Sequence, residues 1–140
     1  LDGTLFPRRS SDLISKRHGL MPIADLPATI GVHFACHARA QNMGPKAMEM
    51  LKLIPGAKPQ LTERCSGHGG KWGIFKENFD RAIKVGKPAG RALMKENPDL
   101  VVSECPLAGP HLRQVIAANG SEPPARIGHP IEVMAVAYGL

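Results

Sequence analysis

Three short segments, each followed at once or after one residue by a cysteine, constrain the fold of this 140-residue chain more than any other feature. Residues 29–34, 59–64 and 100–104 have the length and the flanking residues of strands. The stretches that separate them have helical periodicity. A chain that alternates strand and helix forms right-handed crossovers around a parallel sheet. The sequence therefore predicts an α/β fold with a small parallel sheet of about three or four strands and crossover helices.

Apolar residues spaced three and four apart predict helices over about 43–54, 75–95, 106–118 and 130–138. Pro88 is expected to break or kink the second of these helices, and Trp72 is expected to lie in the core. Residues 1–28 contain three prolines and predict a linker with a short helix after Ser10, leading from a preceding region. The folded domain is expected to span residues 29–140.

Composition excludes several functional classes. The chain has 18 Lys and Arg against 12 Asp and Glu, a net charge of +6, but its basic residues are scattered and aromatic residues make up only 4%. Nucleic acid binding is not expected, because single-strand binding needs aromatic stacking platforms. The sequence contains no run of about 20 apolar residues, so a membrane span is not expected. Leu1–Leu5 lacks a signal-peptide pattern, so we expect a cytoplasmic piece of a larger protein.

The cysteines are the strongest chemical signal. Cys36, Cys65 and Cys105 each follow a predicted strand. Because the carboxyl ends of parallel strands share one edge, where ligands bind, we expect the three thiols to meet there. Soft thiolates select zinc, copper(I) or iron–sulfur clusters. Three is an odd number, and nothing in the sequence indicates secretion, so a disulfide framework is a poor explanation. The alternative is that all three are buried structural cysteines.

The loop after the second predicted strand supports a site at this edge. Gly67, Gly69 and Gly70 permit positive φ angles and bring backbone N–H groups close to cluster sulfurs. His37 and His68 are the candidates for a fourth ligand or a hydrogen-bond donor to the ligands. A second interpretation is a hydrolase in which Cys65 is the nucleophile and a nearby histidine the base. It leaves two of the three cysteines unexplained.

The other histidines have simpler interpretations. His33 lies inside a predicted strand and is expected to be a packed residue. His111 lies on a helix whose exposed side the sequence leaves open. His129 precedes Pro130, which suits the first turn of a helix, so it is interpreted as a helix-start residue.

Several motifs resemble the cysteine-rich CCG domain family. They are Ala35-Cys36-His37-Ala38-Arg39-Ala40-Gln41-Asn42-Met43-Gly44, Leu53-Ile54-Pro55-Gly56, Glu63-Arg64-Cys65-Ser66-Gly67-His68-Gly69-Gly70, Lys76-Glu77-Asn78-Phe79, Lys84-Val85-Gly86-Lys87-Pro88 and Glu104-Cys105-Pro106-Leu107-Ala108-Gly109. His129-Pro130-Ile131 with Ala137-Tyr138-Gly139-Leu140 resembles the end of such chains. The family includes the B subunit of heterodisulfide reductase, the C subunit of anaerobic glycerol-3-phosphate dehydrogenase and the iron–sulfur subunits of glycolate and lactate oxidases. The resemblance covers residues 29–140 and is to the C-terminal of two such domains.

The resemblance carries over residue by residue, with two departures. Cys36 matches the first cysteine of the family pattern, Cys65 the first of its doublet and Cys105 the first of its final pair. Ser66 stands in place of the second cysteine of the doublet, and Ala108 in place of the last cysteine. Three of five ligands therefore remain. A cubane 4Fe-4S cluster with one non-cysteine iron, a 3Fe-4S cluster, and zinc with His37 or His68 all stay open.

The resemblance implies an electron-transfer iron–sulfur domain of an oxidoreductase subunit, which would not turn over substrate alone. In that role Ser66 and the glycines of its loop would surround the cofactor. The implied partners are a flavin-containing dehydrogenase subunit and a quinone-linked membrane subunit, which would hold the protein at the inner face of the cytoplasmic membrane. The alternative is a non-catalytic assembly domain with a zinc or empty site.

Overall fold

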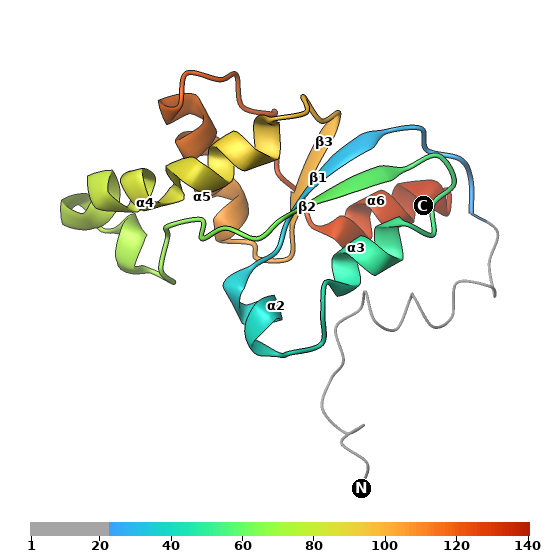
Figure 1. Ribbon diagram of the computed structural model, residues 1–140, viewed down its shortest axis with the longest axis horizontal. Helices are drawn as coiled ribbons and strands as arrows, with labels where there is room; N and C mark the ends of the chain where they lie inside the picture. Colours follow the sequence, from blue (N-terminus) through green and yellow to red (C-terminus); the bar gives the residue numbers. More distant parts are fainter. Residues whose placement is uncertain (1–22) are drawn as a thin grey trace, which may run out of the picture.

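The computed structural model describes residues 23–140 as an α/β unit built on a three-stranded parallel sheet. The sheet has the order β2-β1-β3, so that β1 is central (Figure 1). The elements in chain order are β1 (Thr29–His33), α2 (Cys36–Ala40), α3 (Lys46–Leu51), β2 (Lys58–Thr62), the 3-10 helix η2 (Trp72–Ile74), α4 (Lys76–Met94), β3 (Leu100–Ser103), α5 (Ala108–Ala118) and α6 (Pro130–Ala137). The predicted fold class is confirmed.

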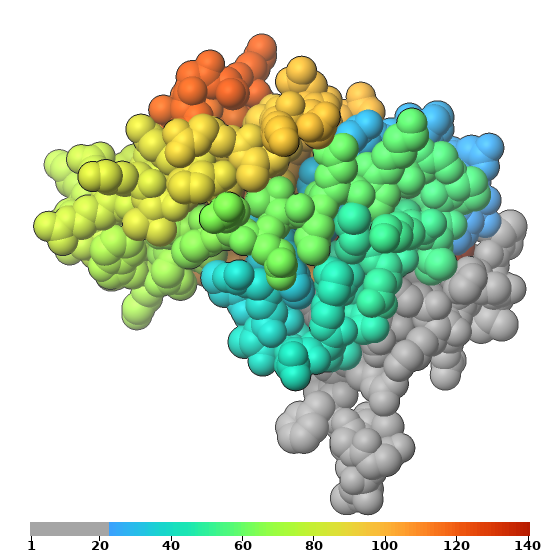
Figure 2. All heavy atoms as spheres, in the orientation of Figure 1, coloured from blue at the N-terminus to red at the C-terminus, as the bar shows by residue number. Residues whose placement is uncertain are grey.

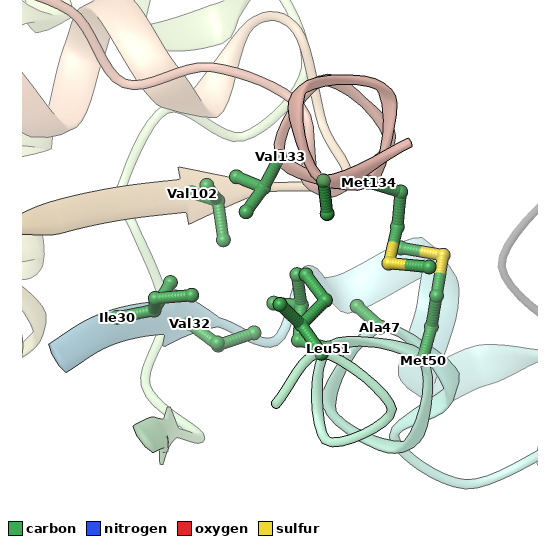
Figure 3. Packing of buried hydrophobic residues seen from close by; sticks show 10 residues of the cluster. Ile30, Val32, Ala47, Met50, Leu51, Val102, Val133 and Met134 are labelled. Atoms are coloured by element: carbon green, nitrogen blue, oxygen red, sulfur yellow. The ribbon is translucent and has the colours of Figure 1, made fainter. Parts of the chain in front are cut away.

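Alternation along the strands directs side chains to two cores, one on each face of the sheet. Ile30, Val32 and Val102 pack with α3 and α6 in the first core, where Met50 and Met134 meet (Figure 3). The second core is formed with α4 and α5. Its members are Ala89, Leu93, Val101, Ala108, Leu112, Ile116 and Ile127. The sheet is therefore the middle of three layers. Both of its faces are covered by helices, so a site can form only at its edges.

Glycine at position 31 allows α4 to approach the sheet closely. A Cβ at Gly31 would lie 3.3 Å from the Leu93 carbonyl oxygen and 3.4 Å from the ring of Pro98. The same helix packs against α5 at Gly86, whose added Cβ would collide with the backbone of Ser66. Helix α4 thereby braces the loop that carries Cys65.

The structure corrects several local predictions. Helix α4 runs without a break through Pro88, because this residue is exposed and the carbonyl that loses its N–H partner, at Lys84, is on the exposed side as well. Trp72 is 41% exposed and is not a core residue. The helix expected over 43–54 is confined to α3, and residues 52–54 continue as a turn in which Leu53 and Ile54 N–H groups bond three residues back.

The segment before β1 is described only from residue 23. The short helix expected after Ser10 lies outside the described residues. Within them, Ala24 N–H donates to the carbonyl of Ala137, and Leu26 N–H donates to that of Pro55. Ile23 and Leu26 pack against the first core. Residues 23–28 are thus attached to the domain, whose boundary at residue 29 stays a prediction.

Candidate metal centre

All three cysteines follow the carboxyl ends of the strands. Cys36 is the first residue of α2, Cys65 follows β2 by three residues, and Cys105 follows β3 by two residues. Because the strands are parallel, these ends lie at one edge of the sheet (Figure 1). The segment after β2 and the region of α2 meet on the face shown in Figure 2. Cys36 and Cys65 are exposed, Cys105 is half-buried, and all three are free thiols. We call this edge the cysteine rim.

The best-defined contact at the cysteine rim joins His68 to Cys105. His68 Nε2 lies 3.8 Å from Cys105 Sγ, and His68 Nδ1 lies 2.6 Å from the hydroxyl of the buried Ser66. Burial lowers the pKa of His68, with a smaller contribution from the charge of His111, so the ring is neutral near pH 7. Because the Ser66 hydroxyl and the Cys105 thiol can each donate or accept, both neutral tautomers of the ring fit these contacts, and in one of them the Nε2 lone pair faces Cys105.

The Cys65 thiol accepts a backbone N–H from Gly67 at 3.4 Å. This position requires glycine twice over: its φ is +91°, and an added Cβ would collide with the carbonyl oxygen of Ala82 on α4. Gly69 and Gly70 also have positive φ, but an added Cβ at Gly70 would meet nothing within 4 Å. The loop is therefore shaped mainly by Gly67.

Cys36 has a cationic neighbour. The guanidinium Nη2 of Arg39 lies 3.6 Å from Cys36 Sγ, one turn further along α2. His37 is exposed on the same helix. Cys105 packs against Phe34, Ala35 and Ala38, which places it beside the start of α2. The structure thus brings Cys105 next to both the α2 segment and His68.

His33 links two of the cysteine-bearing segments, a role that its position in a strand does not reveal. Its ring is 1% exposed. His33 Nε2 lies 3.0 Å from the carbonyl oxygen of Arg64, and Nδ1 lies 3.0 Å from Ser103 Oγ, which also accepts the N–H of Cys105 at 3.3 Å. Since a carbonyl only accepts, Nε2 carries the proton and Nδ1 accepts from Ser103. The His33 ring therefore hydrogen-bonds directly to Arg64, which precedes Cys65, and through the Ser103 hydroxyl to the amide of Cys105.

Burial also lowers the pKa of His33, and the hydrogen bond to the Arg64 carbonyl offsets part of this effect. Smaller contributions come from the charges of His68 and Arg39. A neutral His33 fits the directed hydrogen bonds above, because only a neutral ring can donate at one nitrogen and accept at the other.

His111, whose orientation the sequence left open, is buried beside the cysteine rim. Its ring centroid is 6.2 Å from that of His68 and 6.4 Å from that of Phe79. Burial lowers its pKa, partly offset by a hydrogen bond to the backbone of Ala82. His129 is the N-cap of α6 in a capping box with Glu132, as its place before Pro130 predicted.

The thiols and imidazoles of the cysteine rim are ligands that a soft metal prefers. One thiol–imidazole pair also has a separation that suits a shared metal ion. Zinc bonds of about 2.3 Å to sulfur and about 2.0–2.1 Å to nitrogen, at a tetrahedral angle, separate the two ligand atoms by about 3.6 Å. The Cys105–His68 separation of 3.8 Å is close to this value. In residues 23–140, however, no group of three or more His, Cys, Asp or Glu side chains is arranged to hold a metal ion. A complete site thus needs rearrangement or further ligands.

Two cavities flank the Cys105–His68 contact. One of about 280 Å³ lies beside Cys105 and is lined by Arg113, Arg126 and His129, among others. The other, of about 240 Å³, lies beside His68 and His111. Each residue of this contact therefore lines a cavity of its own. No helix in residues 23–140 combines the length and the apolar character needed to cross a bilayer.

Comparison with known proteins gives two kinds of relative. The chain is 31% identical over 86 residues to the C subunit of anaerobic glycerol-3-phosphate dehydrogenase from Escherichia coli, in strains K12 and O157:H7, covering 61% of this chain and 22% of each relative. It is 31% identical over 118 residues to an uncharacterised iron–sulfur protein of Methanocaldococcus jannaschii, covering 83% of this chain and 23% of the relative.

The chain spans less than a quarter of the length of these curated relatives. No family model matches it, and no solved structure matches it. The sequence is thus similar to part of a dehydrogenase subunit and to part of an iron–sulfur protein.

Proposed function

We propose that this chain is an electron-transfer domain of an iron–sulfur oxidoreductase subunit related to the C subunit of anaerobic glycerol-3-phosphate dehydrogenase. The observation that carries the proposal is the placement of Cys36, Cys65 and Cys105 at one edge of a parallel sheet. Similarity to a subunit of a dehydrogenase and to an iron–sulfur protein supports it. The domain would be residues 29–140, and it would not turn over substrate alone.

In this proposal each residue of the cysteine rim has a role. Cys36, Cys65 and Cys105 supply thiolates, and His68 or His37 supplies a fourth ligand or a hydrogen bond to a ligand. The loop with Ser66, Gly67, Gly69 and Gly70 directs backbone amides to the sulfurs, which tunes a cluster's potential. When bound, the cluster would accept and release single electrons.

The partners belong to the same proposal. A flavin-containing dehydrogenase subunit would deliver electrons, and a quinone-linked membrane subunit would take them up, holding the protein at the inner face of the cytoplasmic membrane. The net charge of +6 suits association with acidic partner surfaces.

A second candidate is an assembly domain that binds zinc. The Cys105–His68 pair favours it, because one sulfur and one nitrogen at this separation match a zinc site. In this case the rim would be structural, and no electron would pass through it.

Metal analysis separates the two candidates. The chain is purified without oxygen, reconstituted with iron and sulfide, and assayed for iron, acid-labile sulfide and an electron paramagnetic resonance signal after reduction. Iron and sulfide in comparable amounts, lost in Cys65→Ala and kept in Ser121→Ala, support the electron-transfer role. Zinc retained in preference to iron supports the assembly role, and binding of neither metal contradicts both.

A further inference from the structure

The cavity beside Cys105 has both hydrogen-bond donors and apolar surface in its wall. It measures about 280 Å³ and lies between the first turns of α5, the 125–129 segment and the first turn of α6. We call it the Arg113 pocket. The lining residues that bear on the choice of a ligand are Cys105, Arg113, Arg126, Ile127, His129 and Glu132.

His129 supplies one hydrogen-bond donor to this pocket. Its Nδ1 accepts the backbone N–H of Ile131 at 3.1 Å, as part of the cap of α6. Because Nδ1 accepts, the ring proton is on Nε2, and within residues 23–140 this N–H has no hydrogen-bond partner. In the same residues, the buried side-chain nitrogen or oxygen that lacks a partner belongs to His111. The unpaired Nε2 of His129 is therefore an accessible atom.

Arg113 supplies a positive charge and further donors. Its Nε donates to the carbonyl oxygen of Pro124 at 2.8 Å, which holds the guanidinium beside the pocket. The part of the chain that the structure describes offers no hydrogen-bond or ion-pair partner to the two Nη groups of Arg113. A guanidinium with both Nη groups free can bind a carboxylate through two parallel hydrogen bonds.

The acidic side chain of the pocket wall, Glu132, is already paired. Its carboxylate oxygens accept from both Nη atoms of Arg126 and from the backbone N–H of His129, the latter at 2.9 Å. Arg126 and Glu132 therefore cancel each other, and Arg113 leaves the pocket with a net positive charge. Unpaired donors together with a net positive charge select an anion whose oxygens accept hydrogen bonds.

The rest of the wall suits a compact apolar body. Pro106, Pro110, Ala125 and Ile127 line the pocket. A cavity of about 150 Å³ accepts a benzene ring, so a pocket of about 280 Å³ has room for a ring or short chain that carries a carboxylate. Small-molecule sites typically combine apolar walls with a few placed polar groups. This composition favours an organic acid over an inorganic anion, which would leave the apolar wall in contact with water.

We propose that the Arg113 pocket binds a small organic carboxylate, whose oxygens accept from the Nη groups of Arg113 and from His129 Nε2 and whose apolar body packs on Ile127. The ligand would cover the Cys105 thiol, so the pocket would place an organic acid directly beside the cysteine rim. This inference goes beyond the proposed function and does not depend on whether the rim holds a cluster, zinc or nothing.

A matched pair of probes tests the charge. The 140-residue chain, before any metal is added, is titrated by NMR with benzoate and with benzamide, which has the same ring but no charge. We expect benzoate to bind about tenfold more tightly than benzamide, the effect of one charge-assisted hydrogen bond. Arg113→Gln should remove this preference. His129→Ser, which keeps an oxygen to cap α6, should reduce it, and Arg91→Gln, at an exposed arginine of α4, should leave it unchanged.

Alkylation locates the bound probe. With benzoate at about ten times its Kd, the reaction of Cys105 with iodoacetamide should slow about tenfold. Cys36, which does not line the pocket, should react at an unchanged rate. Peptide mass spectrometry measures both rates.

Three results would overturn the proposal: equal binding of benzoate and benzamide, binding that Arg113→Gln leaves unchanged, and binding that does not protect Cys105. Inorganic phosphate bound as tightly as benzoate would overturn the choice of an organic acid. If a variant does not fold, the two probes and the protection of Cys105 in the unaltered chain still decide. None of these outcomes involves a metal, so they test this inference separately from the proposed function.

Discussion

The imidazole of His68 lies 3.8 Å from the thiol of Cys105, although the two residues are 37 positions apart in the sequence. The ring is held from its other side by Ser66 at 2.6 Å. Ser66 occupies the position at which the resembled family has a second cysteine. This chain therefore has at that position a hydroxyl that contacts a histidine.

Removing the Ser66 hydroxyl should weaken metal binding without removing any ligand. Ser66→Ala leaves His68 free to turn away from Cys105, and loss of such an orienting contact typically costs about 10–100-fold in metal affinity. Zinc affinity, measured by competition with a chromophoric chelator, should fall by this factor. Ser121→Ala, at an exposed loop position, is the matched control. Equal zinc affinity in Ser66→Ala and the unaltered chain would show that the Ser66–His68 contact is incidental.

Replacing His33 should destabilise the domain. His33→Leu leaves the Arg64 carbonyl without its side-chain donor and the Ser103 hydroxyl without its acceptor, which costs about 1–3 kcal/mol when such groups are buried. The free energy of unfolding, from urea denaturation, should fall by that amount. His37→Leu makes the same exchange at an exposed histidine and should stay within about 0.5 kcal/mol. Similar losses in both variants would argue against the linking role of His33.

Stability should fall as the pH drops below the ordinary histidine pKa. The pKa values of His33, His68 and His111 are all lowered from 6.5 by burial. Below pH 6.5 the unfolded chain therefore binds protons that the folded chain does not. The free energy of unfolding then decreases as the pH falls from 6.5 to the lowered pKa values of the folded chain. Thermal unfolding from pH 8 to pH 5 should show this decrease, and His33→Gln should make it smaller. A melting temperature that rises on acidification would contradict the prediction.

Alanine at Gly67 should be far more costly than alanine at Gly70. Both residues have positive φ, which costs alanine about 1–2 kcal/mol. Only at Gly67 would the new Cβ also collide with the Ala82 carbonyl, so we expect Gly67→Ala to lose about 3 kcal/mol or more. Urea denaturation measures both losses, and alkylation of Cys65 should become faster in Gly67→Ala alone. Equal costs would mean that the loop moves freely relative to α4.

Much of the fold could be predicted because it depends on periodicity. The helices follow from the spacing of apolar residues and the three strands from their length and flanking residues, and parallel topology then places the cysteines at one edge. Helix α2 could not be predicted, because five residues carry too little pattern. The break at Pro88 was expected from local chemistry, but the exposure of that side of α4 cannot be known from sequence.

The side-chain contacts at the cysteine rim could not be predicted from the sequence either, because they also depend on how distant segments pack. The Cys105–His68 contact depends on the path of the 65–70 loop, which Gly67 and α4 determine in three dimensions. The sequence suggested a histidine near Cys65, whereas His68 contacts Cys105. The buried ring of His111 likewise follows from the packing of α5 against α4. For His33, the one signal of a structural role in the sequence is that it is a polar residue inside an otherwise apolar strand.

Iron-edge X-ray absorption of the protein isolated without oxygen, alone or with its partner subunits, tests the central claim most directly. If Cys36, Cys65 and Cys105 hold an iron–sulfur cluster, the first coordination shell of iron will be dominated by sulfur, and iron–iron scattering will be present. Both features should be lost in Cys105→Ser or Cys65→Ala. Iron surrounded by oxygen and nitrogen, without iron–iron scattering, would contradict the assignment of the cysteine rim as an electron-transfer centre.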